Sequence, residues 1–397
     1  MRLRHRSGEL IHLGYCTNVH PAETLDGILH QLDTYAVPVR ERLGEPRLGL
    51  GLWLAHRVAA ELATAPHRAR QLRTELTARG LEVVTLNGFP YRGFHQPVVK
   101  RQVYRPDWSA PDRLHHTLNL IRTLARLLPD DVSVGSISTV PLGWRTGWSR
   151  DHHDRARRHL DRVAEELTYI YLETGRTIRI AFEPEPGCVI ETTEQAIHHL
   201  SGLDTFHFGV CLDLCHLAVG FEEPEAALAE LARAGIGVAK TQVSCALHAA
   251  RPSDPATRRA LAAFDEPRFL HQTRQQARPP IGVDDLAEAL ADPVAMSGDS
   301  PWRTHFHIPV HAEPAPPLTS TRPELRRALA TLLRPDWPVT NHFEVETYTW
   351  SVLPEPPATT AALVEGIAAE LDWTRRELVR LGLAEFPTFP QQRWSSL

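Results

Sequence analysis

The sequence lacks the features that mark several classes of protein. It has no run of about 18 apolar residues, and its basic start, "MRLRHRSGELIHLGYCTNVH", contains no continuous apolar segment of the kind found in a signal peptide. Five cysteines in 397 residues are an odd number and too few for a disulfide framework. We therefore expect a cytoplasmic protein with reduced thiols and no membrane insertion.

Neither sign of charge dominates the sequence. Lys and Arg number 43 and Asp and Glu number 48, for a net charge of -5 with His neutral. There is no clear basic stripe for phosphate contacts, so no nucleic-acid partner is expected. The chain also lacks a G-x-G-x-x-G after an early strand, a P-loop and a G-x-S-x-G elbow. A small molecule is the expected partner.

Short apolar runs alternate with helix-period segments along most of the chain. "FGVCLDLCH" is a typical run, and "RRHLDRVAEELTYIYLETG" is a typical helical segment that ends in a glycine. Repeated strand and helix units imply parallel strands joined by crossovers. About eight such units predict one (β/α)8 TIM barrel over residues 1–397 rather than an open doubly wound sheet. The runs cover residues 13–20, 48–54, 82–90, 132–141, 178–187, 208–216, 238–247, 305–310 and 342–350.

Two long connections interrupt this pattern. Residues 248–304 are rich in Pro, Arg and Ala, and their length predicts an insertion or lid within the barrel domain. Residues 88–112 mix aromatic side chains with Arg and Lys. This second connection either covers the barrel rim or helps to hold an anionic or polyhydroxylated substrate.

Polar residues close nearly every predicted strand, and the carboxyl ends of barrel strands converge on one mouth. A buried carboxylate such as Asp213 costs several kcal/mol unless it is paired or bound to a metal, so a divalent ion explains these residues better than a catalytic triad does. "HFH" at 305–307 is either a strand with one histidine on each face or a loop with two ligands. The polar sets are Asn18 and His20, Asn87, Ser138 and Thr139, Glu183 and Glu185, Asp213 and His216, Gln242 and Ser244, and Glu344 and Glu346.

These residues resemble the xylose-isomerase-like TIM barrels, which include sugar isomerases and epimerases and the endonuclease IV type of abasic-site nuclease. "IAFEPEPG", "GVCLDLCH" and "FEVET" are similar to the family's motifs at strands five, six and eight. Gln242 in "AKTQVS" stands where the family usually has histidine at strand seven, and His307 in "THFHIPV" can compensate. The resemblance implies a zinc, manganese or cobalt ion held by Glu183, Asp213, His216, Gln242, His307 and Glu346.

A closer resemblance covers more of the chain. "YCTNVHPAET", "TLNGFPYRGFHQPVVKRQVYRPDW", "GSISTVPLG" and "VETYTW" are similar to segments of the EboE family of metabolite traffic proteins, which are related to sugar phosphate isomerases and epimerases. The resemblance implies a place in a biosynthetic or metabolite-traffic pathway. It leaves a monomer and a homodimer both open.

Together the residues and the resemblance imply a metal-dependent isomerase or epimerase of a sugar or cyclitol, with or without a phosphate. Glu183, Glu346 and His216 are the expected catalytic residues, and it is open whether Glu183 or Glu185 points inward. One alternative is a phosphoesterase or hydrolase of the endonuclease IV type, which would hold two or three ions. The other is a ligand-binding barrel without catalysis, which Gln242 favours. The expected substrate-binding residues are His20, Asn87, His95, Lys100 and Glu185.

Overall fold

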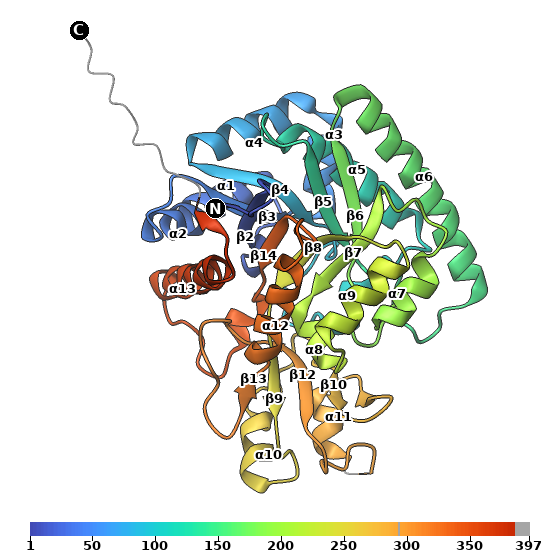
Figure 1. The fold of residues 1–397 in the computed structure, drawn as a ribbon, viewed down its shortest axis with the longest axis vertical. Helices are drawn as coiled ribbons and strands as arrows, with labels where there is room; N and C mark the ends of the chain where they lie inside the picture. The colour runs from blue at the N-terminus through green and yellow to red at the C-terminus, as the bar shows by residue number, and fades with distance from the viewer. Residues whose placement is uncertain (293, 386–397) are drawn as a thin grey trace.

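Eight parallel strands close into a barrel in the computed structural model, which describes residues 1–292 and 294–385 (Figure 1). The last barrel strand pairs with the first in parallel register, from His342 opposite His12 to Val345 opposite Tyr15, so the barrel has no open edge. The predicted (β/α)8 fold is therefore confirmed. The strands are β2 (Leu10–Cys16), β3 (Leu48–Trp53), β4 (Leu81–Asn87), β5 (Val134–Thr139), β6 (Thr177–Phe182), β7 (Phe208–Asp213), β8 (Val238–Val243) and β14 (His342–Val345).

Amphipathic helices cover the outside of the barrel. In α6 (Arg150–Thr174) the buried Leu160, Val163 and Leu167 recur at helical spacing and face the strands, and Gly175 ends the helix in the left-handed conformation (φ 67°). No helix within the described ranges is both long and apolar enough to cross a membrane. The other outer helices are α1 (Leu25–Gln31), α2 (Val37–Arg42), α3 (His56–Thr64), α4 (Pro66–Ala78), α5 (Pro111–Leu127), α7 (Thr193–Leu200), α8 (Leu214–Val219), α9 (Pro224–Arg233), α12 (Arg322–Leu333) and α13 (Thr360–Arg380).

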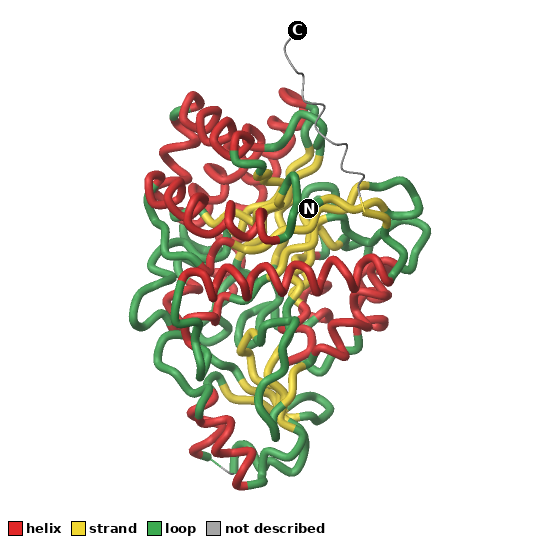
Figure 2. The backbone as a smooth tube through the Cα atoms, turned by 90° about the vertical axis from the view of Figure 1, so that its left-hand side faces the viewer, coloured by secondary structure: helices red, strands yellow, loops and turns green. Residues whose placement is uncertain are grey.

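After β8 the chain leaves the barrel and builds a second, antiparallel sheet with the strand order β11-β10-β12-β9-β13. Figure 2 shows this sheet as a separate group of strands away from the N-terminus, with α10 beyond it. The sheet extends on both sides of the 248–304 segment that the sequence marked as an insertion. Its elements are β9 (Ala246–Ala249), α10 (Pro255–Ala262), β10 (Thr273–Gln275), β11 (Ile281–Val283), α11 (Leu286–Ala291), β12 (Trp302–His307) and β13 (Thr319–Ser320).

Two expected strand runs need correction at this sheet. The run 238–247 is interrupted after Val243, and its last residues begin β9 in the inserted sheet. The run 305–310 also lies largely in that sheet, where β12 pairs with β9 and β10. Both runs are apolar because they are buried, and burial alone does not say which sheet a strand joins.

Short strands and charged side chains close the N-terminal end of the barrel. The strand β1 (Arg2–Arg4) pairs antiparallel with β2, and β15 (Ala384–Glu385) pairs with β1. Beneath them the Arg2 guanidinium contacts the buried Glu82 carboxylate at 2.6 Å and also pairs with Asp131. The charged side chains at this end of the barrel therefore form a network of ion pairs.

Candidate metal centre and active site

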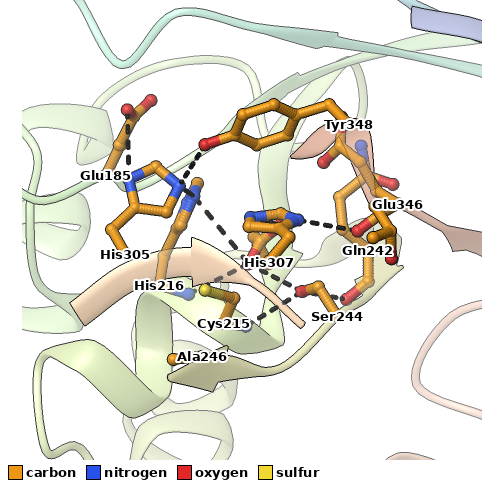
Figure 3. Close-up of polar contacts among 12 residues, drawn as sticks. Glu185, Cys215, His216, Gln242, Ser244, Ala246, His305, His307, Glu346 and Tyr348 are labelled. Carbon is orange, nitrogen blue, oxygen red and sulfur yellow. Dashed lines mark hydrogen bonds and ion pairs between the residues drawn. The ribbon is translucent and has the colours of Figure 1, made fainter. Parts of the chain in front are cut away.

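A pocket lies at the C-terminal ends of the barrel strands, where TIM barrels place their active sites. Its floor carries polar side chains from the barrel and from β12, and its roof is mainly apolar. Figure 3 shows the floor, with His305 and His307 on β12 facing His216, and Glu346 and Gln242 beside His307. The residues that line the pocket are Asn18, Asn87, Phe89, Pro90, Phe94, Lys100, Val103, Tyr104, Glu183, Glu185, His216, Phe269, Leu270, His305, His307, Glu346 and Tyr348.

The aspartate and histidine of "GVCLDLCH" are placed by a helix cap. Asp213 ends β7 and is the N-cap of α8, because its Oδ1 accepts a hydrogen bond from the backbone N–H of His216 at 2.9 Å. The same Oδ1 accepts from Ser244 Oγ at 2.9 Å. Asp213 Oδ2 is buried and has no hydrogen-bond partner. The cap therefore fixes the carboxylate and leaves one oxygen free for a ligand.

Three buried carboxylates meet at the floor. Oxygens of Glu183, Asp213 and Glu346 all lie within 4.8 Å of one another, and Glu183 Oε2, like Asp213 Oδ2, has no partner. Burial, and then the charges of Glu346 and Asp213, raise the pKa of Glu183 well above its usual range. Burial and Asp213 do the same to the pKa of Glu346. Such a cluster binds protons or a cation.

Two asparagines orient the Glu346 carboxylate. Asn18 Nδ2 and Asn87 Nδ2 donate to Glu346 Oε1 at 2.8 and 3.0 Å. Both asparagines are buried and come from the ends of other barrel strands. Because Oε1 already accepts two hydrogen bonds, Oε2 is the oxygen with free lone pairs.

Three histidines hold their rings in one tautomer. His216 Nδ1 lies 2.9 Å from the Pro184 carbonyl, and His307 Nδ1 lies 2.6 Å from the Glu346 carbonyl. His305 Nδ1 lies 2.8 Å from Gln272 Oε1, and Gln272 cannot flip without loss because its Nε2 donates to the Pro186 carbonyl. Since all three partners only accept, each Nδ1 carries the hydrogen and each Nε2 presents a lone pair. Metal-binding histidines are oriented in the same way.

The Nε2 atoms of His216 and His305 face each other, and the Tyr348 hydroxyl lies 3.3 Å from His305 Nε2. His216 Nε2 and His305 Nε2 are 3.0 Å apart, and His307 Nε2 has no hydrogen-bond partner. Burial, and then His216 and His307, lower the pKa of His305 well below its usual range, so an added proton is disfavoured. Two unprotonated imidazole nitrogens this close repel each other, and a cation bound to both would remove that repulsion.

The two clusters share one residue, because Asp213 groups with Glu183 and Glu346 and also with His216 and His307. His307 Nε2 lies 3.9 Å from Asp213 Oδ2. Neutral imidazoles and carboxylates are the donors that zinc and similar divalent ions take in proteins. The unpartnered oxygens and nitrogens therefore fit a divalent ion at this floor.

Gln242 ends β8 beside Glu346 and is fully buried. Neither its amide oxygen nor its amide nitrogen has a hydrogen-bond partner within the described residues. A buried amide without partners costs roughly 1–3 kcal/mol. Its carbonyl oxygen is therefore also available as a ligand.

Glu185 faces the pocket rim rather than the carboxylate cluster. Tyr104 Oη donates to Glu185 Oε1 at 2.5 Å, and His305 Nδ1 lies 3.8 Å from the same oxygen. Gln272 Nε2 donates to Tyr104 Oη at 2.9 Å. Of the two glutamates in "IAFEPEPG", Glu183 therefore points to the floor, and Glu185 joins the barrel to the inserted sheet.

Two of the expected substrate-binding residues do not line this pocket. His20 is stacked on Tyr35 with ring centroids 4.0 Å apart, and His95 packs beside Trp53 and Phe94. Asn87, Lys100 and Glu185 do line it. Both histidines follow strand ends, but their loops turn the side chains into aromatic packing.

The ligand set expected from the sequence included His307 but not His305, and Tyr348 was not singled out at all. His305 and His307 both lie on the strand β12 and on the same face of it, as residues two apart on a strand do. Of the two alternatives for this segment, a strand with one histidine on each face and a loop with two ligands, neither describes it fully. Tyr348 Oη lies 3.3 Å from His305 Nε2. The H-x-H spacing was a signal for His305, whereas Tyr348 had none beyond its place two residues after Glu346.

Solved structures show the same fold. A protein from Anabaena variabilis classed provisionally as a sugar phosphate isomerase/epimerase is 13% identical with a TM-score of 0.51, over 94% of this chain and 99% of that one. A xylose isomerase-like TIM barrel protein from Mycobacterium smegmatis, in complex with magnesium, is 14% identical with a TM-score of 0.50, over 93% and 98%. The comparison with curated proteins finds no match.

The sequence itself identifies the family. Residues 49–251, about half of the chain, match the family described as Xylose isomerase-like TIM barrel. The matched segment runs from β3 to β9 and contains the strand ends that carry Glu183, Asp213 and Gln242. The chain belongs to the xylose isomerase-like TIM barrel family.

Proposed function

We propose that the protein is a metal-dependent isomerase or epimerase of a polyhydroxylated small molecule. The observation that carries this proposal is the pair of buried glutamates, Glu183 and Glu346, whose oxygens lie within 4.8 Å of each other and of Asp213 at the barrel mouth. Glu183, Asp213 and Glu346 would hold the ion, with Gln242 and His307 beside them. When bound, a divalent ion stabilises negative charge on substrate oxygens.

The two glutamates carry out the proton transfer in this proposal. One carboxylate removes a carbon-bound hydrogen next to a carbonyl, and the other returns a proton. Both carboxylates are buried at the barrel mouth and line the same pocket, so each is within reach of a substrate bound there. Asn18 and Asn87 hold Glu346 in one orientation during both steps. His216 is placed to contact a substrate hydroxyl or the ion.

The first test is the metal content of the purified protein, measured by inductively coupled plasma mass spectrometry. We expect about one equivalent of zinc, manganese or cobalt in the wild type and almost none in Asp213→Ala, because the free Asp213 Oδ2 is lost. No metal in either protein, even after reconstitution, would contradict the proposal. A ligand-binding barrel without catalysis would then be the better account.

The second test is hydrogen exchange at substrate carbon. The metal-loaded protein is incubated in D₂O with ketoses and oxidised cyclitols, and deuterium incorporation is followed by NMR. We expect incorporation with the wild type and a loss of about 100-fold or more in Glu346→Gln, which keeps the acceptor oxygen for the asparagines but cannot exchange the proton. Equal incorporation in both proteins would exclude Glu346 from the chemistry.

A second candidate function is metal-dependent hydrolysis of a phosphoester. The imidazole cluster of His216, His305 and His307 favours it, because these donors are more than a single ion at the carboxylates requires. Hydrolytic sites commonly hold two ions about 4 Å apart. Two or three metal equivalents, with release of phosphate from small phosphoesters, would move the assignment to hydrolysis.

A narrower assignment to the EboE-type metabolite traffic proteins rests on the four sequence motifs alone. It adds a pathway context to the proposal and no further chemistry. Its test is genetic: deletion of the gene should block the same pathway as deletion of its neighbours. A homodimer is a separate expectation, which light scattering of the purified protein would check.

A further inference from the structure

The pocket has two chemically distinct halves. The floor holds the carboxylates, imidazoles and asparagines described above. The roof is mainly apolar: the loop after β4 and the inserted segment contribute Phe89, Pro90, Phe94, Val103, Phe269 and Leu270, beside Lys100 and Tyr104 of the same loop and Tyr348 after β14. A substrate that fills this pocket therefore meets polar donors on one side and hydrocarbon on the other.

Three aromatic rings form the centre of the roof. The Phe94 and Phe269 centroids are 5.2 Å apart, and Tyr348 lies 5.6 Å from Phe94 and 4.9 Å from Phe269. The rings come from three separate segments of the chain, and Tyr348 also packs against His307 of the floor with ring centroids 4.7 Å apart. Their edges and faces offer the contacts that an aromatic ring or an alkyl group prefers.

The pocket has no free cation for a phosphate. Lys100 is the only lysine or arginine that lines it in the described part of the chain, and its Nζ contacts Asp285 Oδ2 at 2.5 Å. Phosphate sites in proteins normally use a free Arg or Lys or a helix N-terminus. With Lys100 neutralised, an added phosphate would be placed beside apolar side chains and carboxylates.

The connection after the seventh barrel strand also differs from a TIM-barrel phosphate loop. In many barrels the loops after strands seven and eight, with a short helix, bind phosphate. Here the seventh barrel strand, β8, leads through Ser244 and Cys245 directly into β9 of the inserted sheet. Ser244 Oγ is already bonded to Asp213 and to the backbone N–H of Cys215.

We propose that the substrate is a non-phosphorylated hydroxy-carbonyl compound that carries an apolar substituent, an aryl ring or an alkyl group, beneath Phe94 and Phe269. This inference rests on the proposed function for the chelating end of the substrate. It goes beyond the proposed function because it names the chemistry of the other end of the substrate. Sugar phosphates and cyclitol phosphates are excluded as good substrates.

The test uses hydroxamates, which chelate a metal through one end and vary at the other. Cobalt(II)-loaded protein is titrated with acetohydroxamate, benzohydroxamate and phosphonoacetohydroxamate, and the visible cobalt absorption reports binding. We expect benzohydroxamate to bind about 10- to 100-fold more tightly than acetohydroxamate, because its ring is buried under the roof. Phosphonoacetohydroxamate should bind most weakly.

Substitutions of the roof residues test where the aryl ring of benzohydroxamate binds. Phe94→Ala and Phe269→Ala should each lose most of the preference for benzohydroxamate over acetohydroxamate, measured as the ratio of the two affinities within each variant. Phe206→Ala, at an exposed phenylalanine just before the N-terminal end of β7, is the matched control and should behave as the wild type. Asp285→Asn should raise the affinity for phosphonoacetohydroxamate only, because it releases Lys100.

The outcomes separate this inference from the proposed function. Equal affinity for all three probes, or a preference for the phosphonate in the wild type, would overturn the apolar substituent while the chelating floor remains. A protein that takes up cobalt but binds no hydroxamate would overturn the proposed function as well, because its ion would then have no open position. If Phe94→Ala and Phe269→Ala still bind benzohydroxamate more tightly than acetohydroxamate, the apolar end of the ligand does not bind beneath these two side chains. That result would contradict the inference.

Discussion

At the N-terminal end of the barrel both oxygens of the buried Glu82 carboxylate contact the Arg2 guanidinium, whereas at the C-terminal end Glu183 Oε2 and Asp213 Oδ2 meet no donor. Burial alone would raise the pKa of Glu82, but His12 and Arg2 outweigh it and hold that pKa well below its usual range. The pKa of Glu183 is raised instead. Charges at one end are paired and stabilise the fold, while those at the other end are left available for a ligand.

The largest expected effect comes from breaking the paired end. Glu82→Gln should lower the free energy of unfolding by about 3 kcal/mol, because it leaves the nearly buried Arg2 guanidinium without its main carboxylate partner. Urea denaturation measures the loss, and the metal content should not change. Glu173→Gln, at an exposed glutamate, is the control and should stay within about 0.5 kcal/mol of the wild type. A loss of under about 1 kcal/mol in Glu82→Gln would mean that Asp131 alone neutralises Arg2.

The same substitution at the unpaired end should have the opposite sign. Glu183→Gln should raise the free energy of unfolding of the metal-free protein by about 2 kcal/mol, because it removes a buried acid that repels Asp213 and Glu346. Denaturation is measured after exhaustive dialysis against a chelator. A destabilised metal-free variant would show that Glu183 is a structural residue and would remove the contrast between the two ends.

A smaller gain is expected in metal affinity from Gln242→His. Imidazole is a stronger ligand than an amide oxygen for zinc, so the dissociation constant should fall about tenfold. Competition with a calibrated chelator measures it, and Gln195→His, on the outer helix α7, is the control. Unchanged affinity would mean that the Gln242 side chain does not face the ion.

The last expected effect is a difference between Glu82→Gln and Glu183→Gln in how the free energy of unfolding depends on pH. One titrating group changes this energy by at most about 1.4 kcal/mol per pH unit. Glu82 has a lowered pKa, so its contribution is present above the unfolded value and is lost as pH falls. Glu183 has a raised pKa, so its cost is absent near pH 4 and grows as pH rises. Relative to the wild type, the stability gap of Glu82→Gln should close toward pH 3, and that of Glu183→Gln should open toward pH 7. Parallel profiles would contradict both assignments.

The barrel could be predicted because its signals are local. Each strand is a short buried run, each helix has an apolar stripe, and the count of units selects a closed barrel. The spacing of Asp213 and His216 is also local, since it is one helix cap. The inserted sheet has strands of two to six residues, and its pairing joins β12 with β9 across more than fifty positions, which no local pattern records.

The candidate site divides in the same way. Residues that end barrel strands, such as Glu183 and Glu346, could be named from the sequence, although their role as ligands stays a prediction. Tyr104 and Phe269, which line the pocket, and Gln272, which orients Tyr104 and His305, could not be named, because their places depend on contacts between the loop after β4 and the inserted segment. His20 and His95 show the converse, since a polar residue after a strand can turn into packing.

The division of the imidazole donors between two sheets has an evolutionary consequence. His216 belongs to the barrel, whereas His305 and His307 belong to β12 of the inserted sheet. Substitutions within the insertion can therefore change two of the three imidazoles, together with part of the roof, while the barrel keeps its carboxylates. Remodelling the inserted sheet therefore offers a route to new specificity that leaves the carboxylates of the barrel in place.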